Sequence, residues 1–145
     1  MKITKPLIWM LVIALAVATS EAWAQHSEHG APSGTPPEKL GEVKFLVSSN
    51  AAAQKDFNRA MALFHSFWFE PAKESFARVL EHDRECGMAY WGIAIMSMGN
   101  PFAWPSNASA MKAAAAAMVE AQRVGAKSER ERDYIAALAT YFMDW

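Results

Sequence analysis

The first pattern of hydrophobic and polar positions is an unbroken apolar run from Leu7 to Ala18, preceded by Lys2 and Lys5. Residues 22–24 read Ala-Trp-Ala, the small-x-small pattern that a signal peptidase recognises. The apolar run has 12 residues, whereas a helix needs about 20 residues to cross a bilayer. We therefore expect residues 1–24 to be a secretory signal peptide cleaved after Ala24, with a permanent membrane anchor as the weaker alternative.

Residues 25–40 have no apolar pattern and read QHSEHGAPSGTPPEKL, with three Pro, two Gly and no aromatic residue. Such a segment cannot bury enough apolar surface to offset the entropy of ordering it, which predicts a disordered tether. His26 and His29 lie in it and could bind Cu or Zn weakly. Two imidazoles without a third ligand leave metal binding as the minor alternative.

Residues 41–49 alternate between apolar and outward positions, with Val43, Phe45 and Val47 on one side and Lys44 and Leu46 on the other. This period of two predicts an extended segment that is too short to found a sheet. We expect it to lie against the first helix.

From Ala51 to Trp145 the pattern becomes helical, because 22 of 95 residues are Ala and only seven are Val, Ile or Thr. The predicted fold is all-α. Caps and breakers divide it into helices at about 51–67, 71–82, 87–98, 108–125 and from 129 onward. The last begins with a Ser128–Glu131 capping box, and we expect one apolar face formed by Tyr134, Leu138, Tyr141 and Trp145.

Composition and charge exclude two classes of protein. The formal net charge is -1 and the pI is about 6.4, so the chain lacks the surplus of positive charge with which a protein neutralises nucleic-acid phosphates. Cys86 is the single cysteine. It can form neither an internal disulfide nor a thiolate zinc site.

The second and third predicted helices carry a repeat pattern. Ala72, Phe76, Leu80 and Asp83, followed by Ala89-Tyr90 and Ile93-Ala94, resemble the tetratricopeptide repeat. The register recurs after 34 residues, since Ala60 and Ala94 occupy equivalent positions, as do Asp56 and Tyr90. Small residues at Ala60, Ala72 and Ala94 would let helix axes approach closely. Departures from the pattern are Arg84, where Pro is usual, Phe67, where Gly is frequent, and Asp56, where a large apolar residue is expected.

A closer resemblance covers nearly all of the chain after residue 24. The strings FNRA at 57–60, FHSFW at 64–68, CGMAYWGIA at 86–94, NP with WP at 100–105 and ERERDYI at 129–135 resemble the N-terminal part of a family of exported bacterial tetratricopeptide-repeat proteins. The resemblance implies antiparallel helix hairpins stacked as an α-α superhelix over residues 50–145, continued in longer proteins by further repeats. It implies a binding scaffold and carries over no catalytic residue. Ser49 stands where such sequences tend to have Cys, so a pairing with Cys86 would be lost.

An enzyme is the less favoured class. The chain has no His-Glu-x-x-His, Gly-x-Ser-x-Gly or phosphate-binding Gly-rich motif, and His65 and His82 fall on different helices. We expect no catalytic residue, no cofactor and no metal site. A buried, inert thiol is the favoured interpretation of Cys86. The alternating charges at 129–132 indicate a solvated helix face.

A set of apolar residues falls on first-helix positions that the tetratricopeptide pattern turns toward a concave groove. These are Phe57, Met61, Phe64, His65, Trp91, Ile95 and Met98. The sequence therefore predicts a periplasmic or secreted scaffold that binds an apolar peptide or helix of unknown identity, in the helix-in-groove mode. Two alternatives stay open: the groove residues pack against the tether, the Phe45 segment or further repeats, or the protein handles a small molecule or metal.

Overall fold

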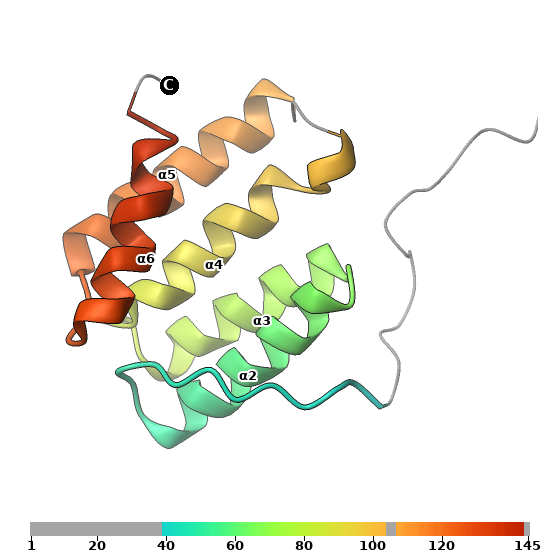
Figure 1. Cartoon of the computed structure of the whole chain (residues 1–145), viewed down its shortest axis with the longest axis vertical. Helices are drawn as coiled ribbons and strands as arrows, with labels where there is room; N and C mark the ends of the chain where they lie inside the picture. The colour runs from blue at the N-terminus through green and yellow to red at the C-terminus, as the bar shows by residue number, and fades with distance from the viewer. Residues whose placement is uncertain (1–38, 104–106, 144–145) are drawn as a thin grey trace, which may run out of the picture. The chain divides into compact units, whose positions relative to one another are not determined.

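Helices make up all the regular secondary structure of the described residues, in which there is no strand (Figure 1). In chain order they are α2 (Ala51–His65), α3 (Phe69–His82), α4 (Gly87–Met98), the 3-10 turn η1 (Pro101–Ala103), α5 (Ala108–Val124) and α6 (Glu129–Thr140). The predicted all-α class is confirmed.

The computed structural model describes residues 39–103 and 107–143, all of which belong to one compact unit, Ala31–Trp145. The predicted signal peptide, almost all of the predicted tether and Trp145 lie outside the described residues. Within them, no helix combines the length and the apolar character needed to span a membrane.

Side-chain caps begin three of the helices where the sequence predicts them. The side chain of Asn50 accepts a hydrogen bond from the Ala53 amide, and that of Asn107 accepts one from the Ala110 amide. At α6 the Ser128 and Glu131 side chains form the complete capping box. Each cap satisfies backbone N–H groups that the first turn of a helix leaves without a partner.

The first helix ends two residues before its predicted end, because Phe67 adopts a left-handed backbone conformation with φ of 63°. The Phe67 amide donates to the carbonyl of Phe64, and the Trp68 amide donates to that of Leu63, both at 3.0 Å. These two bonds form a Schellman motif, in which glycine is the usual left-handed residue. Phe67 therefore occupies a glycine position of the fold.

Neighbouring helices pack as hairpins. The most extensive contacts join α2 to α3 and α4 to α5, contacts between α3 and α4 link the two pairs, and α6 packs against both α4 and α5. The described helices thus build a stack in which each one contacts mainly its neighbours in sequence.

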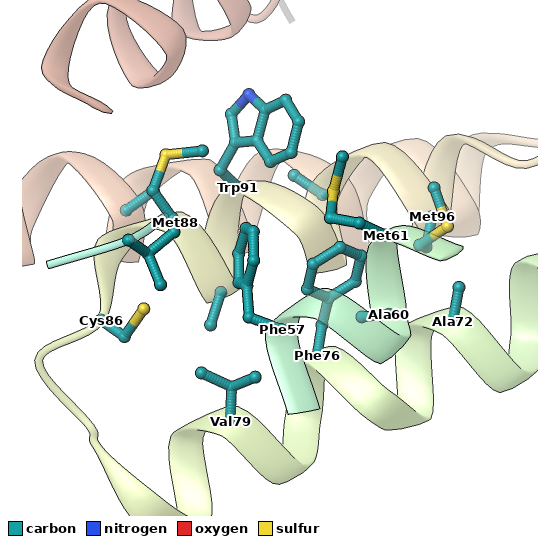
Figure 2. Packing of buried hydrophobic residues seen from close by; sticks show 14 of the residues in the cluster. Phe57, Ala60, Met61, Ala72, Phe76, Val79, Cys86, Met88, Trp91 and Met96 are labelled. Atoms are coloured by element: carbon teal, nitrogen blue, oxygen red, sulfur yellow. The ribbon is translucent and has the colours of Figure 1, made fainter. Parts of the chain in front are cut away.

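The core lies between α2, α3 and α4, where the rings of Phe57 and Phe76 meet edge to face with centroids 5.3 Å apart (Figure 2). Ala60, Ala72 and Ala94, the predicted close-contact residues, are fully buried. Gly92 of α4, which was not predicted as a close-contact residue, lies directly against α3. A Cβ atom added to it would lie 2.5 Å from the Phe76 ring.

The predicted face of the last helix that carries Tyr134 and Tyr141 is not its buried face. Tyr134 is 41% exposed and Tyr141 46% exposed, whereas the buried stripe consists of Glu131, Ile135 and Ala139. The stripe keeps the helical spacing of four residues but is displaced by one position from the tyrosines. The expected solvated face at 129–132 is also wrong for Glu131, which is 1% exposed.

Candidate functional site

The residues before α2 form an extended segment that crosses α2 and reaches the start of α6 (Figure 1). We call residues 40–47 the N-terminal strap. Val47 is buried, Val43 and Phe45 are half-buried, and Lys44 and Leu46 point outward, with Leu46 71% exposed. This is the alternation that the sequence predicts, and the strap lies against the first helix as expected.

Side-chain amides of α2 hold the main chain of the strap. The Gln54 Oε1 atom accepts a hydrogen bond from the Val47 amide at 2.9 Å, and Gln54 Nε2 donates to the Phe45 carbonyl at 2.8 Å. The Asn58 Oδ1 atom accepts from the Phe45 amide at 3.1 Å. Gln54 and Asn58 therefore satisfy the strap's backbone groups as a neighbouring β-strand would.

The strap is also held from α6. The Arg130 guanidinium donates to the Leu46 carbonyl, and its central carbon lies 4.7 Å from the centre of the Phe45 ring. The Glu131 carboxylate accepts a hydrogen bond from the Ser48 amide. The strap thus connects the first and last described helices, which are more than 60 residues apart in sequence.

Glu131 is charged in this buried position because backbone donors surround it. Burial alone would raise the pKa of its carboxyl group, but hydrogen bonds from Ser48 and Ser128 outweigh burial, so the pKa is lowered from its ordinary value. The carboxylate therefore remains an acceptor at neutral pH for the residue that follows the strap.

Aromatic rings join the strap to two of the predicted groove residues. The Phe45 ring lies 5.6 Å from that of Phe57 and 5.5 Å from that of Tyr134, measured between centroids. The Tyr134 ring lies 5.6 Å from that of Trp91. The structure thus brings Phe57 and Trp91 into one aromatic cluster with a strap residue. For Phe57, this agrees with the alternative that the groove residues pack against the Phe45 segment.

The remaining predicted groove residues have different surroundings. Met61 is buried in the same core as Phe57, with Phe64 and Ile95 half-buried against it, and His65 is exposed with its ring stacked on that of Phe64. Met98 is buried in a separate cluster with Met111 and Ala114, where α4 meets α5. Met98 is therefore not beside the strap. The surface that the set still presents is formed mainly by His65, Phe64 and Ile95.

The polar half of this site was not predicted from the sequence. Gln54 and Asn58 are four residues apart and so share one face of α2, next to a predicted extended segment. That spacing was the available signal. Nothing local marked Arg130 and Glu131 as contacts of the strap, because they are more than 80 residues from it in sequence.

A grouping of Ser75, His82 and Asp56 has the residue types of a hydrolase triad but not its geometry. His82 Nε2 lies 3.2 Å from Asp56 Oδ2, whereas the buried Ser75 hydroxyl donates to the main-chain carbonyl of Asp56 at 3.1 Å. The serine is neither next to the histidine as a nucleophile must be nor accessible. The three residues join α2 to α3.

Cys86 lies at the N-terminus of α4, where burial, the largest effect, raises the pKa of its thiol. The Ser49 hydroxyl lies within hydrogen-bonding reach of the thiol. It donates to Asp83 Oδ2 at 2.6 Å. A buried thiol with a raised pKa is a poor nucleophile. In the part of the chain that the structure describes, no three His, Cys, Asp or Glu side chains are placed to hold a metal ion.

Comparison with known proteins returned no matching family model, no matching curated protein and no matching solved structure. Fold and site define the class from this chain alone: an all-α protein of packed helix hairpins whose N-terminal strap is held between α2 and α6.

Proposed function

We propose that this protein is an exported, tetratricopeptide-type scaffold that binds a segment of another protein along α2, α4 and α6, without catalysis of its own. One observation carries the proposal: this side of the helices already holds an extended stretch of polypeptide, bound through its main chain by Gln54 and Asn58. A surface that binds a polypeptide backbone in this way has the chemistry of a peptide-binding scaffold.

The packing of small residues supports the tetratricopeptide interpretation. Ala60 and Ala94, 34 residues apart, are both fully buried, and Phe57 and Trp91, at the same spacing, both belong to the aromatic cluster around Phe45 and Tyr134. Equivalent positions therefore have equivalent surroundings in the first and second hairpins. That is what stacked repeats require.

Export rests on the sequence, with its basic residues, apolar run and Ala-Trp-Ala at 22–24. Mass spectrometry of the protein from a periplasmic or culture fraction should find Gln25 at the N-terminus. An intact Met1 in the membrane fraction would replace export with membrane anchoring.

Photo-cross-linking in cells tests the scaffold. A benzophenone amino acid at His65 on α2 or at Ile95 on α4 should give a discrete cross-linked partner protein. The matched controls are Glu81 on α3 and Lys112 on α5, which are exposed on the second helices of the hairpins. Equal cross-linking at all four positions, or none at His65 and Ile95 in folded protein, would contradict binding at this surface.

A further inference from the structure

We propose that the N-terminal strap, residues 40–47, is a displaceable internal ligand, and that the partner which replaces it is an extended peptide with apolar residues at every second position. This inference rests on the proposed binding function and adds the chemistry of the partner and its regulation. It also changes the expected binding mode, since the sequence analysis favours a helix in the groove.

The bonds to the strap are independent of its sequence. Gln54 and Asn58 bind the amide and carbonyl of Phe45 and the amide of Val47, and Arg130 binds the carbonyl of Leu46. All these partners are main-chain atoms, so any peptide in the same extended conformation would satisfy them. A helical peptide would not, because its own backbone already uses these donors and acceptors.

Selectivity comes from the alternate side chains. Val43, Phe45 and Val47 face the helices, and Phe45 packs against Phe57 and Tyr134. Lys44 and Leu46 face solvent. A competing peptide therefore needs apolar residues at three alternate positions, with a large aromatic residue at the middle one. The positions between them face solvent and accept any residue that keeps the peptide soluble.

The strap can leave while the helices stay folded, because the bonds that fix its connection to α2 lie beyond its C-terminal end. Ser49 donates to Asp83, and Asn50 caps α2 and donates to the His82 carbonyl at 2.9 Å. These bonds fix the connection to α2 and do not involve residues 40–47. Release of the strap would expose Phe57 and the amides of Gln54 and Asn58 without breaking the contacts among α2, α3 and α4.

Tethering makes the strap a competitor. A segment joined to its site by a short connection acts at an effective concentration of about millimolar. The apparent affinity for an external peptide is therefore reduced in proportion to the fraction of molecules in which the strap is released. An external partner therefore displaces the strap only when its inward side chains pack more favourably than those of the strap.

The test uses the full chain and a fluorescein-labelled peptide with the sequence of residues 40–48, followed by fluorescence anisotropy. In the variant Val43→Ser/Phe45→Ser the strap loses two of its three inward side chains, and the peptide should bind at least about tenfold more tightly than to the wild type. The matched control, Lys44→Ser/Leu46→Ser, changes only outward side chains and should bind the peptide like the wild type. A peptide with Ser at the positions of Val43 and Phe45 should not bind.

Equal binding to wild type and to the Val43→Ser/Phe45→Ser variant, or no binding to that variant while its circular dichroism remains helical, would overturn the inference. Equal binding of a helix-favouring peptide of matched apolar content would overturn the extended mode.

If the double variant loses its helical circular dichroism spectrum, hydrogen exchange of the wild type tests the displaceable strap instead. The amides of Phe45 and Val47 should exchange at least about tenfold faster than those of Val79 and Trp91, through local opening of the strap. Exchange at the same rate as these core amides would mean that the strap leaves only on global unfolding and is structural. Cross-linking at His65 and Ile95 with that result would retain the scaffold and refute the displaceable strap.

Discussion

Phe67 has a backbone conformation that is unfavourable for a residue with a Cβ atom. It is the one described non-glycine residue with positive φ, and a left-handed conformation costs an L-residue with a Cβ atom about 1–2 kcal/mol. Phe67→Gly should therefore increase the free energy of unfolding by about 1 kcal/mol. Urea denaturation measures the change.

Loss of the Phe67 ring would act in the opposite direction, because this half-exposed ring contacts that of Phe69 at a centroid distance of 6.1 Å. Phe67→Ala is the matched control, since it removes the ring and keeps the strained backbone. Phe67→Gly must be more stable than Phe67→Ala, and the reverse order would show that the backbone conformation carries no strain.

Glu131 should make stability depend on pH. Its folded-state pKa is lowered, so its stabilising contribution is present above its ordinary pKa and is lost as the pH falls through the folded-state pKa. At pH 7, Glu131→Gln should lower the free energy of unfolding by about 1–3 kcal/mol, because the amide group cannot accept from both Ser48 and Ser128. Urea melts at about pH 7 and pH 3 should show the difference between wild type and variant shrinking in acid.

Glu129→Gln is the control for this titration, because Glu129 is an exposed glutamate on the same first turn. It should change stability little at either pH. A Glu131→Gln effect that persists undiminished in acid would mean that packing of the side chain, rather than its charge, supports the strap.

At the scale of the elements, the sequence predicts the features that short-range interactions determine, such as where helices begin. Asn50, Asn107 and the Ser128–Glu131 box mark their helix starts because each cap bonds an amide only three residues away. The burial of α6 is different. Its apolar residues fit two neighbouring faces equally well, and only packing against α4 and α5 selects the one that contains Ile135 and Ala139.

The contact between α3 and α4 depends on Gly92. Gly92→Ala should lower the free energy of unfolding by about 1–3 kcal/mol, although alanine favours helix by about 1 kcal/mol over glycine. The reason is that the new methyl group would lie 2.5 Å from the Phe76 ring. Urea denaturation of Gly92→Ala tests this.

The companion variant is Phe76→Leu, which removes the ring atoms that the methyl group would meet. In that background Gly92→Ala should cost less than in the wild type, as expected for two residues in contact. Equal costs in both backgrounds would place the strain elsewhere.

For the described molecule as a whole, sequence gives the helices and the position of the strap on α2, but not the polar site. Glutamine and asparagine on a helix are typical of a solvated surface, and only the arrival of Val47 and Phe45 beside Gln54 and Asn58 makes them backbone ligands. The partners from α6 depend on how the last helix stacks on the earlier hairpins. No short-range pattern contains that information.

The strap should therefore couple elements that are distant in sequence. Phe45 and Tyr134 are 89 residues apart, yet their rings meet edge to face at 5.5 Å. A double-mutant cycle of Phe45→Ala and Tyr134→Ala, measured by urea denaturation, should give a coupling energy of about 0.5–1.5 kcal/mol. Tyr141, which follows the last residue of α6 and has its ring against Phe142, supplies the control cycle with Phe45→Ala, which should give a coupling near zero. A coupling near zero for Phe45 and Tyr134 would mean that this ring contact adds nothing to the binding of the strap by α6, which would then rest on Arg130 alone.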